Sequence, residues 1–163
     1  MISYQTSKRI LKKGIIKIKS ESILSINSLN RVASSNIYSK FNYPSGDNAA
    51  FDGYAINSSD TKNINQNKSK AFKIIGSISA GKKPFKTKIK KFEAVEIMTG
   101  GIIPKGFDTI IPIEQINFYP NNKNRKFILI DKKISKFNHV RFAGSDYKKN
   151  ELVIKKNTII LPN

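Results

Sequence analysis

The sequence predicts a mainly β protein with short N-terminal helices, an α+β chain. Short runs rich in Ile, Val, Phe and Thr recur from residue 54 onward, and Gly, Pro and Asn separate them. Patterns typical of helices occur in the first 33 residues. Together these observations favour many short strands behind a helical N-terminus.

The composition excludes several classes of protein. In 163 residues there is no cysteine and one histidine, so disulfides, cysteine metal sites and histidine-rich metal sites are ruled out. No apolar run approaches the ~18 residues of a membrane span, and residues 1–5 lack the apolar core of a signal peptide. We therefore expect a cytoplasmic protein with no membrane partner.

The net charge of +19 has two interpretations. It is typical of a protein that binds nucleic acid or another anion. However, the lysines are scattered and accompany many Asn and Ile, three residue types with A/T-rich codons, and the aromatics do not alternate with them as stacking platforms would. We do not expect nucleic-acid binding as the main role.

Two helices are predicted near the N-terminus. Residues 3–13 form the first, with Ser3 as its N-cap and Gly14 as its stop. Residues 22–33 form the second, because their apolar side chains recur at helical spacing. Between them, residues 15–18 are expected to be extended.

Residues 43–56 are the stretch around which we expect the chain to be organised. Pro44 and Gly46 bend its entry, and Asp52 with Gly53 forms a tight turn before a strand at 54–56. A carboxylate on a fixed turn between small residues suits a polar site. The alternative is that Asp52 only begins an ordinary Asp-Gly turn.

The rest of the chain reads as strands and loops. Residues 57–70 and 82–91 are expected to be exposed loops. The predicted strands are residues 72–79, 94–98, 109–113, 127–130, 139–142, 151–154 and 158–161.

Two further turns carry candidate site residues. Thr99, Gly100 and Gly101 follow a strand and offer a hydroxyl and backbone N–H groups to an anion, although the spacing is not that of a P-loop and an ordinary tight loop fits as well. Asp146 follows the turn at Gly144. Carboxylates such as these can hold Mg²⁺, or can simply lie in solvent or pair with the abundant lysines.

Four motifs, in this order, resemble the N-terminal and linker region of molybdopterin molybdenumtransferases, the molybdenum insertases that include the C-terminal domain of gephyrin. Residues 29–33 resemble Ala-Leu-Gly-Arg-Val. Residues 47–55, Asp-Asn-Ala-Ala-Phe-Asp-Gly-Tyr-Ala, are similar to Asp-Asn-Ser-Ala-Met-Asp-Gly-Tyr-Ala of that family. Residues 94–108 resemble its Ile-Met-Thr-Gly-Ala…Pro-x-Gly-x-Asp segment, and residues 140–146 resemble Val-Arg-x-x-Gly-Glu-Asp.

The resemblance implies an enzyme that takes adenylylated molybdopterin and molybdate to molybdenum cofactor and AMP, with Mg²⁺ and as a homodimer. It implies catalytic roles for Asp52, Thr99 and Asp146, of which Asp52 and Asp146 would also be metal ligands. It places substrate contacts at Asn48, Gly100, Gly101 and Arg141. The alternative function is a non-catalytic dimerisation module, or a module that binds anions or nucleic acid.

The sequence departs from the family at several positions. Ala49, Gly101 and Ser145 stand where the family has Ser, Ala and Glu. Asn30, Asn150 and Asn157 stand where it commonly has Gly. Because Asn is the next best residue in the left-handed conformation, we expect the same turns at these three positions.

The resemblance also predicts two lobes with complex, bifurcated and coiled sheets. Residues 1–43 with 139–163 would form a discontinuous N-terminal, dimerisation lobe, and 44–138 an inserted β-rich linker lobe. Members of the family continue into a molybdopterin-binding domain that is absent here, which suggests a fragment, a split gene or a trimmed chain. We expect the 163 residues alone to be inactive.

Overall fold

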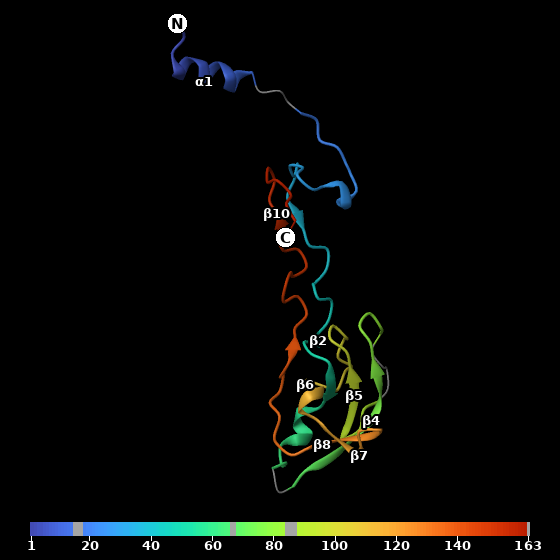
Figure 1. Ribbon diagram of the computed structural model, residues 1–163. Helices are drawn as coiled ribbons and strands as arrows, with labels where there is room; N and C mark the ends of the chain where they lie inside the picture. Colours follow the sequence, from blue (N-terminus) through green and yellow to red (C-terminus); the bar gives the residue numbers. More distant parts are fainter. Residues whose placement is uncertain (15–17, 66–67, 84–87, 163) are drawn as a thin grey trace. The chain divides into compact units, whose positions relative to one another are not determined.

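The computed structural model of the chain describes residues 1–14, 18–65, 68–83 and 88–162 (Figure 1). The chain forms two compact units, one of Met1–Ile37 with Leu152–Asn163 and the other of Tyr38–Glu151. The division into 1–43 with 139–163 and 44–138 stays a prediction. The expectations for 15–18, 57–70 and 82–91 rest partly on residues 15–17, 66–67 and 84–87, which lie outside the described residues.

The first predicted helix is confirmed as α1 (Tyr4–Lys13). The Ser3 hydroxyl accepts a hydrogen bond from the Thr6 amide at 3.2 Å, which satisfies one of the free N–H groups of the first turn. At the other end, the Gly14 amide donates to the carbonyls of Ile10 and Leu11. None of the helices in the described part of the chain has the length and apolar character needed to cross a membrane.

The second predicted helix, over residues 22–33, is wrong. Only a single 3₁₀ turn, η1 (Ser25–Asn27), forms there. The segment is rich in Ser and Asn, whose side chains compete for backbone groups and so disfavour a continuous helix. The Ser28 hydroxyl donates to the Ser25 carbonyl at 2.6 Å, and Asn30 has a φ of 62°.

The structure is mainly β, as predicted. The short 3₁₀ helices of the second unit are η2 (Ser58–Thr61) and η3 (Ile113–Gln115). The strands are β1 (Ile37–Tyr38), β2 (Asn48–Ala49), β3 (Gly53–Ile56), β4 (Lys70–Ile78), β5 (Glu93–Ile97), β6 (Thr109–Pro112), β7 (Asn117–Asn121), β8 (Asn124–Ile130), β9 (Val140–Arg141) and β10 (Leu152–Ile154). Residues 158–161 form no strand, only an isolated bridge from Ile159 to Val32.

A curled six-stranded sheet with the order β6-β3-β5-β4-β8-β7 dominates the second unit (Figure 1). The strand β4 runs parallel to β5, while the other neighbours in this sheet are antiparallel. Two small sheets pair β1 with β10 and β2 with β9.

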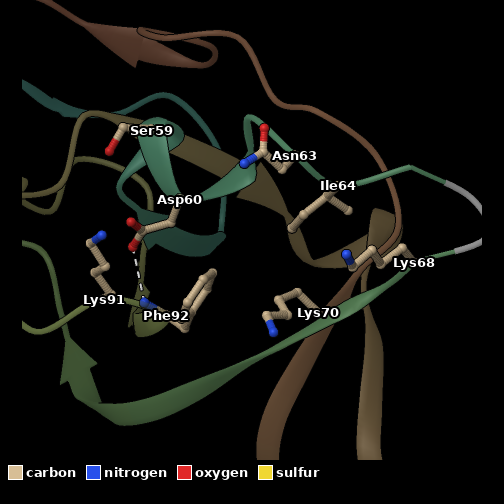
Figure 2. Close-up of a pocket in the computed structure, with 8 residues that line it drawn as sticks. All are labelled: Ser59, Asp60, Asn63, Ile64, Lys68, Lys70, Lys91 and Phe92. Carbon is tan, nitrogen blue, oxygen red and sulfur yellow. Dashed lines mark hydrogen bonds between the residues drawn. The ribbon is translucent and has the colours of Figure 1, made fainter.

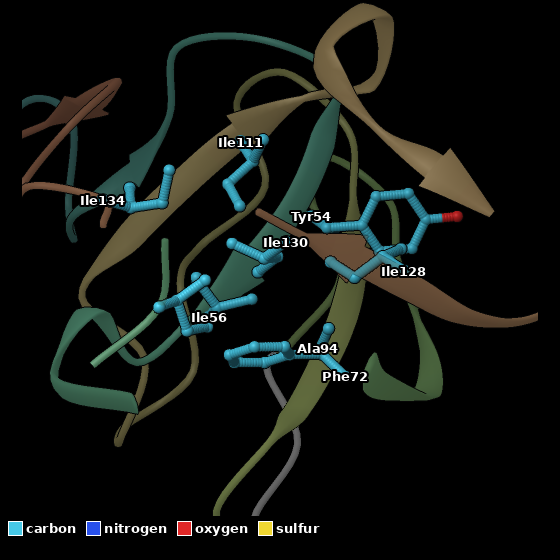
Figure 3. Packing of buried hydrophobic residues seen from close by; sticks show 9 residues of the cluster. Tyr54, Ile56, Phe72, Ala94, Ile111, Ile128, Ile130 and Ile134 are labelled. Atoms are coloured by element: carbon cyan, nitrogen blue, oxygen red, sulfur yellow. The ribbon is translucent and has the colours of Figure 1, made fainter. Parts of the chain in front are cut away.

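Both faces of the strands β3 and β6 are buried. Successive side chains of a strand point to opposite faces, so they enter two different clusters. Tyr54 and Ile56 of β3 belong to one hydrophobic cluster (Figure 3), whereas Ala55 between them belongs to a second. The first cluster consists of Tyr54, Ile56, Ile64, Phe72, Ala94, Ile111, Ile128, Ile130 and Ile134.

The second hydrophobic cluster connects the sheet to the segments that carry the candidate site. It consists of Ala49, Ala55, Ile78, Val95, Ile97, Phe107 and Ile110, and Val140 packs against it. Ala49 lies in β2 and Val140 lies opposite it in β9. The core therefore fixes the β2–β9 pair beside the ends of β3 and β5.

Candidate functional site

The candidate site residues come from three segments of the second unit. Asp52 lies in the bend between β2 and β3, and Thr99 to Gly101 form the loop after β5. Asn48 lies in β2, directly opposite Arg141 in β9, and Asp146 lies in the turn that follows. Backbone hydrogen bonds join these segments, for example from the Ala49 amide to the Gly101 carbonyl at 3.0 Å.

The side chain of Asp52 is bound by Thr99. The Thr99 amide donates to Oδ1 of Asp52 at 2.6 Å, and the Thr99 hydroxyl donates to the same oxygen at 2.7 Å. No hydrogen bond to Oδ2 is present among the residues that the structure describes. Since Asp52 is exposed, this second oxygen can accept a further partner.

The two hydrogen bonds from Thr99 lower the pKa of the Asp52 carboxyl below its ordinary value of 3.8. The hydroxyl contributes most and the amide next, while partial desolvation acts weakly in the opposite direction. Hydrogen bonds that are made to the charged form stabilise that form. Asp52 is therefore a carboxylate throughout the neutral pH range.

The backbone N–H groups of the loop after β5 are used within the protein. The Gly100 amide donates to the Ala49 carbonyl at 2.9 Å, and the Gly101 amide donates to the Met98 carbonyl at 2.8 Å. Together with the bond from Thr99 to Asp52, this occupies the three amides that the sequence suggested as anion donors. In this arrangement the loop holds Asp52 and β2 in place.

Arg141 and Asp146 form an ion pair on the surface. The Nη2 atom of Arg141 donates to Oδ2 of Asp146 at 2.5 Å, and the carboxylate raises the pKa of the arginine above its ordinary value. The Ser145 hydroxyl lies 3.4 Å from the other oxygen of Asp146. Both oxygens of Asp146 therefore already have a partner, in contrast to Asp52.

Asn48 is buried, yet its Oδ1 atom has no hydrogen-bond partner among the described residues. Buried polar atoms are nearly always paired. Oδ1 of Asn48 lies in β2, opposite Arg141 of β9. It can accept a hydrogen bond from a donor outside the described chain, such as a ligand or a water molecule.

The sequence matches the MoeA N-terminal region (domain I and II) over residues 2–163. The chain belongs to this family. Similar proteins include the molybdopterin molybdenumtransferase of Haemophilus influenzae, 34% identical over 82% of this chain, and that of Bacillus subtilis, 28% identical over 83%.

A solved structure supports the same family. The crystal structure of the molybdopterin biosynthesis MoeA protein of Pyrococcus horikoshii OT3 covers 99% of this chain with a TM-score of 0.83 and 28% identity. The chain spans 30% of the length of the Haemophilus protein, 31% of the Bacillus protein and 41% of the Pyrococcus chain. It therefore corresponds to the N-terminal part of the MoeA proteins that it matches.

Sequence reasoning missed one residue of this region. In the sequence Asp47 stands out only as the first residue of a motif, but its Oδ1 atom accepts a hydrogen bond from the Ala143 amide at 2.9 Å. This bond spans 96 positions of the chain and holds the turn that carries Asp146 against the start of β2. Its place directly before Asn48 in the long MoeA-like motif is the signal that could have revealed it.

The assignment of Asp52 and Asp146 as metal ligands stays a prediction. Among the described residues, no group of three or more His, Cys, Asp and Glu side chains is placed to hold a metal ion. Mg²⁺, however, usually takes only one or two protein carboxylates and completes its shell with water and substrate phosphates. Asp52, with its open oxygen, fits that role, while Asp146 is held by Arg141.

Proposed function

We propose that this chain is the N-terminal part of a molybdenum insertase, an enzyme that takes adenylylated molybdopterin and molybdate to molybdenum cofactor and AMP. The match to the MoeA N-terminal region over residues 2–163 carries the proposal. The names of the Haemophilus and Bacillus relatives supply the reaction class. The pterin-binding part of the active site would come from sequence outside these 163 residues.

In this proposal Asp52 is the group that meets the reactants. It is ionised, exposed, and fixed by two short hydrogen bonds that reach only one of its oxygens. The other oxygen can accept a hydrogen bond from a reactant or contact a cation. Thr99 acts through Asp52 as a positioning residue, because both of its donors point to that carboxylate.

Asn48 and Arg141 are proposed as the substrate contacts of the β2–β9 pair. Arg141 uses one Nη atom for Asp146, and its guanidinium carries further N–H donors that suit a phosphate or molybdate oxygen. The unpaired Oδ1 of Asn48 would accept a hydrogen bond from the substrate or from a water that the substrate holds. Asp146 then orients Arg141.

Gly100 and Gly101 contribute shape to this site. A Cβ atom on Gly101 would lie 2.8 Å from Cγ1 of Ile97 and 2.9 Å from the Met98 carbonyl oxygen. The missing side chain therefore permits the close approach of Ile97 and of the Met98 carbonyl to the loop, and the backbone of Gly100 stays exposed beside it.

Mg²⁺ belongs to the proposal as the ion that Asp52 would help to hold. Asp146, the second predicted ligand, would contact the ion through the oxygen that lies 3.4 Å from the Ser145 hydroxyl, while its other oxygen stays with Arg141. When bound, it would neutralise negative charge on phosphate or molybdate oxygens. A homodimer and a cytoplasmic location are proposed on the same resemblance to molybdenum insertases.

The proposal is tested by AMP release from adenylylated molybdopterin in the presence of molybdate. A protein of the relatives' length that carries this region should release AMP and yield molybdenum cofactor. The 163-residue chain alone should do neither, because positioning of the reactants accounts for up to ~7–11 kcal/mol of such barriers. Absence of AMP release by the longer protein would contradict the proposed activity.

A further inference from the structure

A pocket of about 290 Å³ opens in the second unit beside η2 and the start of β5. Figure 2 shows the side chains of Lys68, Lys70 and Lys91 spread around the ring of Phe92 and the carboxylate of Asp60. Ser59, Asn63 and Ile64 complete the lining. None of the residues of the Asp52–Thr99 site or of the β2–β9 pair takes part.

The charges in this pocket are not balanced. The lining carries three ammonium groups and one carboxylate, and Oδ2 of Asp60 already accepts a hydrogen bond from the Phe92 amide at 2.9 Å. The ion pairs found in the described part of the chain join Arg31 to Glu21 and Arg141 to Asp146, so none neutralises these lysines. Like charges held around a concave surface favour the binding of an anion.

One of the pocket lysines, Lys70, lies against an apolar floor. Nζ of Lys70 lies 5.1 Å from the centre of the Phe92 ring, a cation–π distance. Phe92 in turn packs edge-on against the buried Phe72, with ring centroids 5.4 Å apart. Ile64 is 8% exposed and belongs to the first hydrophobic cluster. The floor is thus part of the core, and Asp60 fixes the backbone at Phe92.

We propose that this pocket binds a small molecule that carries a tetrahedral dianion, such as a phosphate group. The lysine ammonium groups would contact the oxygens, and Phe92 with Ile64 would contact any carbon portion. The volume lies at the lower end of the range for small-molecule sites, which limits the occupant to a free oxyanion or a small phosphate ester. The site is separate from the proposed insertase chemistry.

The test is a titration of the ¹⁵N-labelled 163-residue chain with inorganic phosphate at constant ionic strength, followed by amide chemical shifts. Saturable shifts centred on Asn63 and Phe92 are expected. Parallel titrations with glycerol 3-phosphate and with molybdate distinguish a small phosphate ester from a free oxyanion as the occupant. Tighter binding of the ester indicates a phosphorylated metabolite, and equal or tighter binding of phosphate or molybdate indicates a free oxyanion.

Variants make the test specific to the pocket. Lys70→Gln and Lys91→Gln should each raise the Kd about thirtyfold, the effect of removing one unit charge at ~4 Å from a dianion in a water-like dielectric. Lys70→Arg should retain binding, because it keeps both the charge and the contact with the Phe92 ring. Lys123→Gln and Lys132→Gln, exposed lysines outside the pocket, are the matched controls and should change the Kd less than about twofold.

Two results would overturn the proposal. One is the absence of any saturable shift with the three ligands. The other is a Kd that rises equally in the pocket variants and in the Lys123 and Lys132 controls, since that would mean diffuse attraction to the charge of the whole chain. Well-dispersed amide spectra of every variant exclude misfolding as the cause.

Discussion

Thr99 donates two hydrogen bonds to a single oxygen of Asp52, one from its amide at 2.6 Å and one from its hydroxyl at 2.7 Å. The two residues are 47 positions apart in the chain. The contact ties the bend before β3 to the loop after β5, next to the antiparallel β3–β5 pair. It fixes the orientation of a carboxylate and leaves the other oxygen open, which is what a ligand-binding acid needs.

Thr99→Val should raise the pKa of Asp52 towards 3.8, because it removes the hydroxyl bond that is the largest cause of the lowered value. The amide bond remains, so a part of the shift should persist. Thr99→Ser keeps the hydroxyl and is the matched control. Carboxyl ¹³C shifts of Asp52 as a function of pH give the measurement, and an unchanged pKa in Thr99→Val would refute the assigned cause.

The same contact predicts the sign of a pH effect on stability. Because the folded-state pKa of Asp52 is lowered, the stabilisation is fully present above the ordinary value of 3.8 and is lost as pH falls through the folded-state pKa. The difference in unfolding free energy between wild type and Thr99→Val should therefore shrink with falling pH. Urea unfolding at several pH values checks this, and a difference that grows in acid would contradict it.

Gly53→Ala should destabilise the second unit severely. An added Cβ would lie 2.0 Å from the Ile111 carbonyl oxygen and 3.0 Å from Cα of Pro112, both backbone atoms of the neighbouring strand β6. Overlap of this size requires the β3–β6 pair to separate, so we expect a loss of more than ~3 kcal/mol. Gly14→Ala is the control, since its Cβ meets nothing closer than 3.7 Å. Thermal unfolding of both variants is the measurement.

The ion pair of Arg141 and Asp146 should contribute little to stability. Their side chains are 49% and 31% exposed, and exposed pairs are worth about 0–1 kcal/mol. A double-mutant cycle with Arg141→Gln and Asp146→Asn should give a coupling free energy in that range. The activity of the longer protein should nevertheless fall in both single variants, because Arg141 is the proposed oxyanion contact. A large coupling with full activity would indicate a structural pair instead.

Much of the fold could be predicted because its signals are local. Ser3 and Gly14 mark the two ends of α1, and the apolar run at 94–98 corresponds to β5. The expectation of left-handed turns at three asparagines is confirmed, with φ values of 62° at Asn30, 67° at Asn150 and 64° at Asn157. Here the residue type alone restricts the backbone.

The sequence-based predictions failed where contacts between distant parts of the chain determine the local structure. Residues 22–33 have helical spacing, but Ser and Asn side chains and pairing with the C-terminal segment prevail: the Ala33 amide donates to the Thr158 carbonyl, and the Ile160 amide donates to the Arg31 carbonyl. Sequence identified Asp52 and Thr99 through a motif, yet it could not show that Thr99 donates to Asp52. That contact depends on the pairing of β3 with β5, which periodicity does not specify.

For two of the departures from the family pattern, the packing supplies a physical reason. Gly101 stands where the family has Ala, and a Cβ atom added there would approach Cγ1 of Ile97 to 2.8 Å, so the smaller residue suits this packing. Ala49, where the family has Ser, is buried in the second hydrophobic cluster, where a methyl group needs no hydrogen-bond partner. Ser145 lies 3.4 Å from Asp146 and so stays beside the proposed site.

Asp52→Asn in a protein of the relatives' length is the most direct test of the proposed insertase site. Asn retains an acceptor for both donors of Thr99 and suits an Asp-Gly turn, so the fold should be kept, with only the small drop in melting temperature that follows from losing the charge in these hydrogen bonds. The charge is lost, so molybdate insertion and AMP release should fall strongly. Asp131→Asn, an exposed position outside the site, should leave both unchanged. Equal insertion activity in the Asp52 and Asp131 variants would contradict the assignment and leave Asp52 as a turn residue.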